Sequence, residues 1–155
     1  MGEMSRKPTT VRMLGEGDIG TLERVAPGVF DYPVNRSCAE AFLADPHLHI
    51  VVAIADNQIV GFASAVDYIH PDKPPEMWIN EVGVAPDCRN AGVGTDVLKA
   101  MLGQAQAIGC NEAWVLTDSE NAAAIALYES AGGQEERSGQ RMFVFALPGE
   151  KPAGI

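Results

Sequence analysis

The sequence of 155 residues has little positive charge, few cysteines and no long apolar run. Lys and Arg together number 11 against 21 Asp and Glu, which gives a net charge of −10. This balance argues against nucleic acid as a partner, because nucleic-acid binding calls for a basic face. It permits a cationic substrate, since an acidic cleft raises the local concentration of cations. A solvated acidic surface without a role explains the charge equally well.

No apolar stretch reaches the roughly 20 residues that a membrane-spanning helix needs. Residues 1–8 carry charges but no apolar segment of a secretory signal follows them. Cys38, Cys88 and Cys110 are odd in number and widely spaced, which suits reduced thiols better than a disulfide framework. No His, Cys and acidic residues have the spacing of a zinc site. We therefore expect a cytoplasmic protein with no metal and no membrane contact.

Residues 79–102 organise the chain. An apolar, strand-like run ends at Pro86, and a turn containing Gly92 and Gly94 opens an amphipathic helix. The glycines expose backbone N–H groups at the positive end of the helix dipole, which suits phosphate oxygens. Arg89 can add a charge-assisted contact. The apolar residues of the helix share one face: Val93, Val97, Leu98, Met101, Leu102 and Ala105. The segment predicts a strand, an anion-binding loop and a helix.

Two other phosphate-binding loops fit less well. The helix start lacks the Gly-Lys-Ser/Thr of nucleoside triphosphatases. The third glycine of a dinucleotide-binding fingerprint would fall at Val97. A tight turn that needs glycine only for packing is the remaining alternative, and Arg89 favours anion binding over it.

Apolar periodicity and capping residues predict one domain over residues 1–155, with its core at about 10–147 and frayed ends at 1–10 and 148–155. The expected elements of the first half are a strand at 11–14, a helix from Asp18 to Ala26, a second helix with a capping box of Ser37 and Glu40 that ends before Pro46, and a hairpin of 49–55 and 58–66. A stiff loop at 70–75, a strand at 77–84, a helix at 93–108 and a strand at 113–117 follow. The last expected elements are a helix capped by Asp118 or Ser119 and ended by Gly132-Gly133, and a strand at 141–147. This order predicts an α/β fold with a single mixed, mostly antiparallel sheet flanked by helices.

Two motifs carry a resemblance. The run from Val82 to Pro86, followed by Arg89-Asn90-Ala91-Gly92-Val93-Gly94, resembles motif A of the GNAT superfamily of acetyl-CoA-dependent N-acetyltransferases. The run from Asn121 to Tyr128 resembles the second signature, although Gly132-Gly133 stands where the family usually has Gly-Phe. The resemblance implies the GNAT fold, acetyl-CoA as cosubstrate, and these cofactor-binding residues: Val82, Gly83, Val84, Arg89, Asn90, Ala91, Gly92, Val93, Gly94, Thr95 and Asn121. Asn121 either bonds the cofactor or only caps its helix.

Acetyl transfer to an amine needs a deprotonated nucleophile and a proton for the leaving thiolate. The resemblance implies that Tyr128 is the acid, and a phenol pKa of about 10 suits that role. Its alternative is a core aromatic. Glu81 is the candidate base, since a carboxylate on a central strand is costly unless it is used or paired. Strand alternation predicts that Glu81 shares a face with Ile79 and Gly83. A structural hydrogen bond is the alternative for Glu81.

The segments 68–71 and 78–84 are similar to those of the GNAT-type aminoglycoside 3-N-acetyltransferases. This resemblance implies that the 3-amino group of a polycationic aminoglycoside is acetylated. The implied substrate-binding residues are Phe30, Asp31, Tyr32, Tyr68, Glu81 and Asp118, and Glu120 either lines the substrate path or belongs to a solvated face. We also expect the chain to form a homodimer. A GNAT enzyme for a polyamine, an amino acid or a protein N-terminus remains open. So does a non-catalytic CoA-binding module, against which the retention of both catalytic candidates counts.

Overall fold

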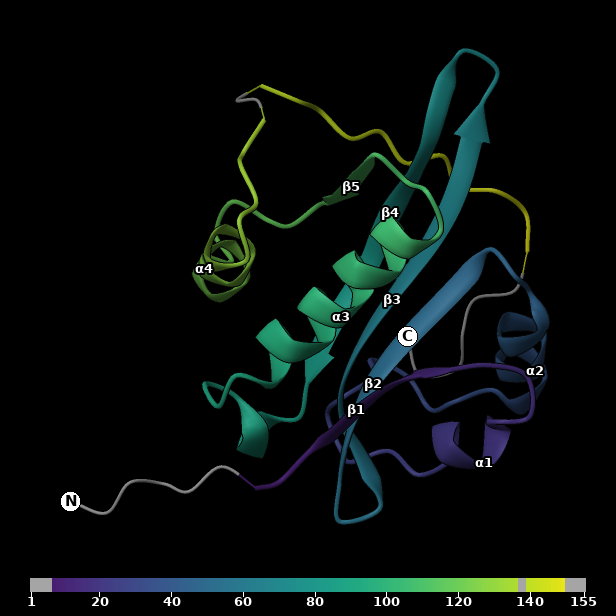
Figure 1. The fold of residues 1–155 in the computed structure, drawn as a ribbon, viewed down its shortest axis with the longest axis vertical. Helices are drawn as coiled ribbons and strands as arrows, with labels where there is room; N and C mark the ends of the chain where they lie inside the picture. The colour runs from purple at the N-terminus through teal and green to yellow at the C-terminus, as the bar shows by residue number, and fades with distance from the viewer. Residues whose placement is uncertain (1–6, 137–138, 150–155) are drawn as a thin grey trace.

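The structure is a computed structural model that describes residues 7–136 and 139–149. Its strands are β1 (Thr10–Leu14), β2 (Leu48–Ala55), β3 (Gln58–His70), β4 (Lys73–Val84) and β5 (Glu112–Val115). They form one sheet in the order β1-β2-β3-β4-β5 (Figure 1). The first four strands pair antiparallel, and β5 pairs parallel to β4. The predicted mixed, mostly antiparallel sheet is therefore confirmed.

The helices are α1 (Ile19–Leu22), α2 (Arg36–Ala44), α3 (Val93–Ala107) and α4 (Ala122–Ser130), with a 3-10 turn, η1, at Pro86–Cys88. Helix α3 connects the parallel strands β4 and β5 and lies across one face of the sheet (Figure 1). It buries Val93, Val97, Leu98, Met101 and Ala105. A Cβ atom at Gly61 of β3 would lie 2.5 Å from a methyl carbon of Val93, so Gly61 faces α3. The predicted amphipathic helix is confirmed.

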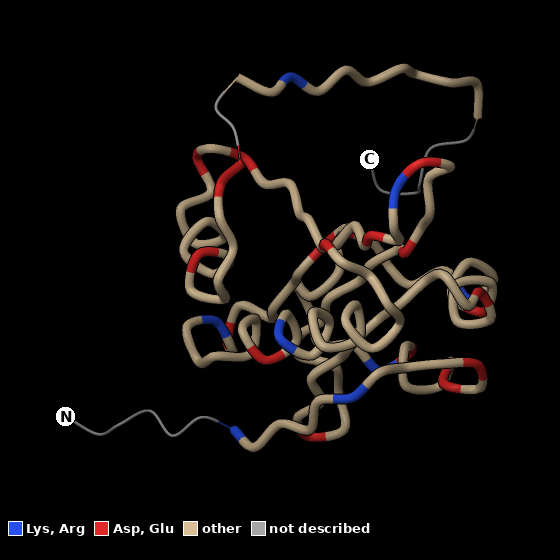
Figure 2. The backbone as a smooth tube through the Cα atoms, turned by 45° about the horizontal axis from the view of Figure 1, so that its top comes forward, with Lys and Arg blue, Asp and Glu red and all other residues tan. Residues whose placement is uncertain are grey.

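None of the helices in the described part of the chain is long and apolar enough to cross a membrane. Figure 2 shows acidic positions on several sides of the fold rather than on one patch. The excess of acidic charge therefore does not identify a site by itself.

Two predicted helix boundaries are wrong. The first helix ends at Leu22 rather than Ala26, because the chain beyond it pairs with β3: the Arg24 carbonyl accepts from Ile59 N, and Ala26 N donates to the Ile59 carbonyl. Backbone groups used in this bridge cannot also continue a helix.

The capping box of the second helix is wrong as well. The side chain of Asn35, not Ser37, accepts the hydrogen bond from Cys38 N at 3.0 Å. The side chain of Glu40 accepts a hydrogen bond from Arg36 at 3.1 Å instead of closing a box.

The β3–β4 hairpin is longer than predicted. Most of the expected stiff loop at 70–75 is strand, and only Pro71 and Asp72 lie between β3 and β4. Pro74 and Pro75 are tolerated because β5 begins to pair with β4 only at Glu76, so no ladder hydrogen bond to β5 is lost there.

The predicted strand at 141–147 is wrong. This segment is irregular, and its large apolar side chains (Met142, Phe143, Val144, Phe145 and Leu147) are each at least 75% exposed. Strand propensity reflects packing on a half-buried pleated surface, and here the segment has no neighbouring strand among the described residues.

Other end positions also differ from the predictions. Strand β5 ends at Val115 rather than residue 117, and Asn121, not Asp118 or Ser119, caps α4. Thr10 belongs to β1 rather than to a frayed end. Of the predicted frayed ends, residues 1–6 and 150–155 lie outside the described residues.

Candidate functional site

A β-bulge at Asn80 decides where Glu81 points. Ser64 lies opposite Glu81 and Ala65 lies opposite Ile79, so Asn80 has no partner on β3. The extra residue reverses the alternation of β4, which places Ile79 and Glu81 on opposite faces of the sheet. Ile79 is 2% exposed in the core, whereas Glu81 is open to solvent. The predicted shared face of Glu81 and Gly83 is confirmed, and the prediction for Ile79 is wrong.

The loop between α1 and α2 approaches β4 closely on the face opposite α3. A Cβ atom at Gly83 would lie 2.7 Å from the Val29 carbonyl oxygen, and one at Gly28, where φ is +81°, would lie 2.8 Å from Pro86 Cδ. Only glycine permits both approaches. The ring of Phe30 then packs on Phe62, with the ring centroids 4.4 Å apart.

This approach brings Asp31 beside Glu81. The pKa of Glu81 is raised, first by partial burial, then by repulsion from the Asp31 carboxylate, and by a hydrogen bond with Asp31. A carboxylate with a raised pKa is a better proton acceptor near neutral pH. Two adjacent carboxyl groups also attract an ammonium group. The pair can therefore bind a cationic amine and take a proton from it.

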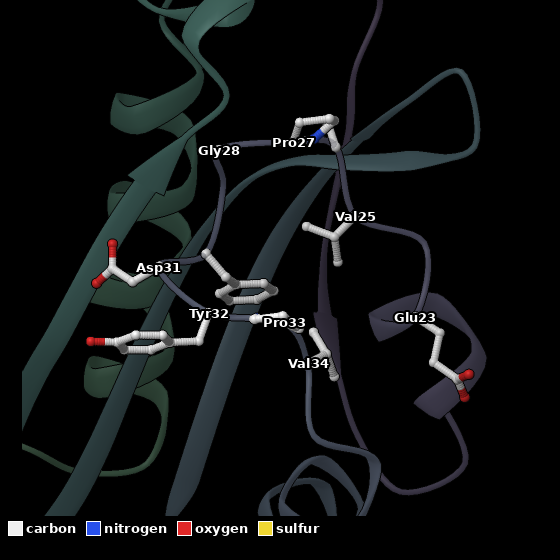
Figure 3. A pocket seen from close by; sticks show the side chains of 10 residues that line it. Glu23, Val25, Pro27, Gly28, Asp31, Tyr32, Pro33 and Val34 are labelled. Atoms are coloured by element: carbon white, nitrogen blue, oxygen red, sulfur yellow. The ribbon is translucent and has the colours of Figure 1, made fainter. Parts of the chain in front are cut away.

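A cavity of about 490 Å³ runs along the same loop. Its lining includes Phe30, Asp31 and Tyr32, three of the predicted substrate-binding residues. Figure 3 shows the side chains of Asp31 and Tyr32 at one end of the cavity and that of Glu23 at the other. The cavity thus extends away from the carboxyl pair along the surface.

The turn that opens α3 fits an anionic group. Asn90 and Gly92 have φ of +60° and +84°, and no side chain in the described residues caps the helix. The first N–H groups of a helix have no partner within it. A Cβ atom at Gly94 would lie 3.4 Å from Leu127 of α4 and 3.5 Å from Val84 of β4, so this turn lies where three elements meet. The predicted pyrophosphate-binding residues, including Ala91, Val93 and Thr95, lie in this turn.

Strands β4 and β5 diverge beside that turn. Their pairing covers only residues 76–79 and 112–115, whereas β4 continues to Val84. One edge of β4 around Val82 and Val84 therefore has no partner strand in the described residues. Exposed Arg89 donates from Nε to the Val84 carbonyl at 3.3 Å, at the end of this edge. The GNAT resemblance implies that Val82 and Val84 bind the cofactor, and this edge leaves their backbone groups without a partner strand in the described residues.

Tyr128 lies on α4 and is half-buried, and this burial raises the pKa of its phenol. Its carbonyl accepts a hydrogen bond from Gly133 N at 2.9 Å. A Cβ atom at Gly133 would lie 2.8 Å from that carbonyl oxygen, which explains a glycine at this position. A phenol kept protonated at neutral pH is suited to donate a proton.

Four predicted site residues make other contacts in the described part of the chain. Asp118 and Glu120 lie in an exposed turn before α4, where their carbonyls accept backbone hydrogen bonds. Asn121 caps α4 by accepting from Ala124 N at 3.1 Å, as one of its two predicted roles requires. Tyr68 lies farther along the β3–β4 hairpin, where its hydroxyl donates to Glu76.

The sequence interpretation missed a tryptophan pair. Trp78 of β4 and Trp114 of β5 lie opposite each other, with their ring centroids 5.1 Å apart and their planes 6° from parallel. Trp78 pairs with Val66, two residues beyond Ser64 on β3, so it shares the face of Glu81. Two tryptophans in adjacent predicted strands were the available signal, and the bulge at Asn80 hid their relation to Glu81.

Comparison with known proteins agrees with this architecture. Residues 21–133 match the acetyltransferase (GNAT) family. A mycothiol acetyltransferase of Paenarthrobacter aurescens is 30% identical over 91 residues, which are 57% of this chain and 28% of that protein. The L-2,4-diaminobutyric acid acetyltransferase of Nocardia farcinica is 30% identical over 78 residues, 50% of this chain and 39% of that protein. The chain thus spans less than half the length of these two relatives.

A third relative is covered more fully. The aminoglycoside N(6')-acetyltransferase type 1 of Salmonella typhimurium is 29% identical over 120 residues, which are 75% of this chain and 82% of that protein. Among solved structures, an aminoglycoside acetyltransferase from an uncultured soil metagenomic sample, in complex with sisomicin, superposes with a TM-score of 0.79 at 17% identity and covers 90% of this chain and 97% of that one. At that identity the superposition shows the fold alone. The family match confirms the predicted fold, and the chain belongs to the acetyltransferase (GNAT) family, whose cosubstrate is acetyl-CoA.

Proposed function

We propose that this chain transfers the acetyl group of acetyl-CoA to an amino group of an aminoglycoside. The observation that carries the proposal is the pair of carboxyl groups of Asp31 and Glu81 beside the open edge of β4. An aminoglycoside carries several ammonium groups, and an acidic site attracts and orients them. The relative from Salmonella typhimurium, which carries an aminoglycoside acetyltransferase name, supports the same substrate class.

In this reaction, residues of the chain would bind the cosubstrate, accept a proton from the amine and donate a proton to the sulfur. Bound acetyl-CoA supplies an activated acetyl thioester. The N–H groups of the first turn of α3 and the guanidinium of Arg89 hold phosphate oxygens. The carboxylate of Glu81 accepts the proton that the reacting ammonium must lose, while Asp31 holds positive charge beside it. The hydroxyl of Tyr128 gives its proton to the departing sulfur.

The acetylated position has two candidates. The resemblance of segments 68–71 and 78–84 favours the 3-amino group, and the name of the Salmonella relative favours the 6'-amino group. NMR of the acetylated product distinguishes them, because acetylation shifts the protons on the substituted carbon. A product modified at the 6' position only would contradict the 3-amino prediction, and the proposed substrate class would still hold.

The name of the Nocardia farcinica relative favours a second acceptor class, a small diamino acid. The test is thiol release from acetyl-CoA with sisomicin, neamine, spermidine, L-2,4-diaminobutyrate and a short peptide in parallel. We expect the highest kcat/KM for the aminoglycosides. Turnover of diaminobutyrate, spermidine or the peptide with none on either aminoglycoside would overturn the proposal.

The predicted homodimer and the cytoplasmic location belong to the same proposal. Light scattering of the purified protein measures the first, and fractionation of expressing cells measures the second. A monomeric mass, or protein recovered outside the cytoplasm, would contradict them.

A further inference from the structure

An aromatic cluster lies on the face of Glu81, farther along the hairpin toward its turn. It consists of Trp78, Trp114, Tyr68 and Glu76, and it joins β3, β4 and β5. Trp78 stacks on Trp114, and Trp114 Nε1 donates to the Tyr68 hydroxyl at 2.6 Å. The Tyr68 hydroxyl donates in turn to a carboxylate oxygen of Glu76. These contacts fix the orientation of both indole rings.

The contacts hold the cluster together, but one of its rings is exposed to solvent. Trp78 remains 37% exposed, whereas Met77 and Ile79, on the opposite face of β4, are at most 2% exposed. A stack whose only role was to attach β5 to β4 would gain by burying both rings, because each large aromatic buries apolar area that stabilises the fold. The outer ring of the stack is instead available to a ligand.

A negative charge lies at the edge of this aromatic surface. The carboxylate of Glu76 accepts the hydrogen bond from Tyr68, which lowers the pKa of Glu76 and keeps it ionised. Nε2 of His70 lies 3.8 Å from the same carboxylate. An aromatic face beside a carboxylate suits a ring that carries an ammonium group, because the face attracts the cation and the carboxylate pairs with it.

The spacing links this surface to the carboxyl pair. Trp78 precedes Glu81 by three residues on one strand and shares its face, so their Cα atoms are roughly 7–10 Å apart at 3.2–3.4 Å per residue with one bulge. A molecule of linked rings spans such a separation. A single small amine at Glu81 does not reach Trp78.

We propose that Trp78 stacks on a second amino-sugar or aminocyclitol ring of the acceptor while a first ring presents its amine to Glu81, with Glu76 binding an ammonium group of the second ring. This inference rests on the proposed function and extends it: the site selects acceptors of two or more linked cationic rings. Trp78 is then a residue that determines specificity. It takes no part in the proton transfers.

The two tryptophans of the cluster are the only two in the sequence, so intrinsic fluorescence reports on this surface directly. Titration of the full chain with sisomicin should give a saturable fluorescence change. Glucosamine, a single ring, should give none in the same concentration range. A Trp78→Leu variant keeps apolar packing on Trp114 but lacks the aromatic face, so the change should be lost.

Kinetics give the second readout. We expect Trp78→Leu to raise the KM for sisomicin about 3- to 30-fold, the range of a lost cation–π contact, and to lower the sisomicin preference over glucosamine by the same factor. Trp78→Phe should restore most of the preference. The control is Ile69→Ala on the same hairpin, a 75% exposed apolar residue outside the cluster, which should leave both KM values unchanged.

Two outcomes would overturn this inference. The first is sisomicin turnover in Trp78→Leu and Trp78→Phe with the KM of the unmodified chain, which leaves the proposed function standing. The second is an unchanged fluorescence titration in Trp78→Leu. If the unmodified chain acetylates no aminoglycoside, the proposed function fails, and the titration still decides whether linked cationic rings bind at Trp78.

Discussion

Asp31 and Glu81 come from different elements, a loop and a central strand, yet the Asp31 carboxylate lies close enough to raise the pKa of Glu81. Two features of the backbone produce this pair. The bulge at Asn80 turns Glu81 away from the core, and the missing side chain at Gly83 lets the loop lie against β4. The carboxyl pair therefore depends on residues that carry no charge.

Glu81→Gln keeps the shape of the side chain but removes its charge and its basicity. We expect kcat/KM for an aminoglycoside to fall about 10²- to 10⁴-fold, the usual contribution of a general base. The Kd for CoA, measured by calorimetry, should not change. Glu16→Gln, at an exposed position outside the site, is the matched control. Full activity in Glu81→Gln would assign the proton transfer to another group.

Asp31→Asn should move the acidic limb of the pH–rate profile to lower pH. Glu81 must be ionised to accept a proton, and its pKa is raised by burial and by Asp31. Removal of the second carboxylate leaves only the effect of burial, so the limb should approach the ordinary glutamate value. The KM should rise about tenfold with the loss of one charged hydrogen bond to the acceptor. An unmoved limb would show that Asp31 does not affect Glu81 in solution.

The same substitution should affect stability in a pH-dependent way. Because the pKa of Glu81 is raised by folding, the folded chain binds this proton more tightly than the unfolded chain does. Stability is therefore lost as the pH rises from the ordinary glutamate pKa through the raised one. Above that window Asp31→Asn should have a higher Tm than the unmodified chain, and the difference should disappear at acidic pH.

Gly92→Asp tests the anion-binding turn. It places a carboxylate where phosphate oxygens are expected, and Asp tolerates the left-handed φ of +84° better than most residues. Calorimetry should show CoA affinity reduced at least tenfold, about 1.4 kcal/mol, with the fold retained. Gly103→Asp on the same helix, where an added Cβ meets nothing within 4 Å, is the control. Unchanged CoA affinity in Gly92→Asp would place the phosphates elsewhere.

Tyr128→Phe removes the phenolic proton and keeps the half-buried ring that packs against the core. We expect kcat to fall roughly 10- to 1,000-fold with little change in the KM for the acceptor, because proton donation to the sulfur acts in the transition state. The raised pKa of Tyr128 should place the basic limb of the kcat profile above the ordinary pKa of a phenol in the unmodified chain. An unchanged kcat would assign Tyr128 to packing alone.

The sequence predicted the elements that are determined by residues close together in the chain. The turn at Gly92 and Gly94 and the apolar face of α3 both follow from short-range spacing. The predictions failed where distant backbone groups decide the structure. Helix α1 stops early because residues 24–26 pair with Ile59, and the face of Ile79 changes because β3 accommodates an unpaired Asn80.

The candidate site divides in the same way. The GNAT motifs named Tyr128 and the phosphate-binding turn, and the cost of a carboxylate on a central strand named Glu81; the roles of these residues stay predictions. The sequence also named Asp31, but its contact with Glu81 depends on close approaches at Gly28 and Gly83 that no local pattern encodes. The strand expected at 141–147 did not form although its sequence is strand-like. Such a sequence forms a strand only where a partner strand is available.

Gly83→Ala tests how the loop positions the acceptor site. The added methyl group would lie 2.7 Å from the Val29 carbonyl oxygen and 2.6 Å from Phe62 Cε1, so the loop must move away from β4. We expect unfolding free energy to fall by about 1–3 kcal/mol, the usual cost of overpacking, and KM for the aminoglycoside to rise. The Kd for CoA should stay within about twofold, since α3 lies on the other face. Gly103→Ala, which meets nothing within 4 Å, is the control for a glycine replaced without crowding. An unchanged acceptor KM in a destabilised Gly83→Ala would show that Asp31 reaches the acceptor without this close approach.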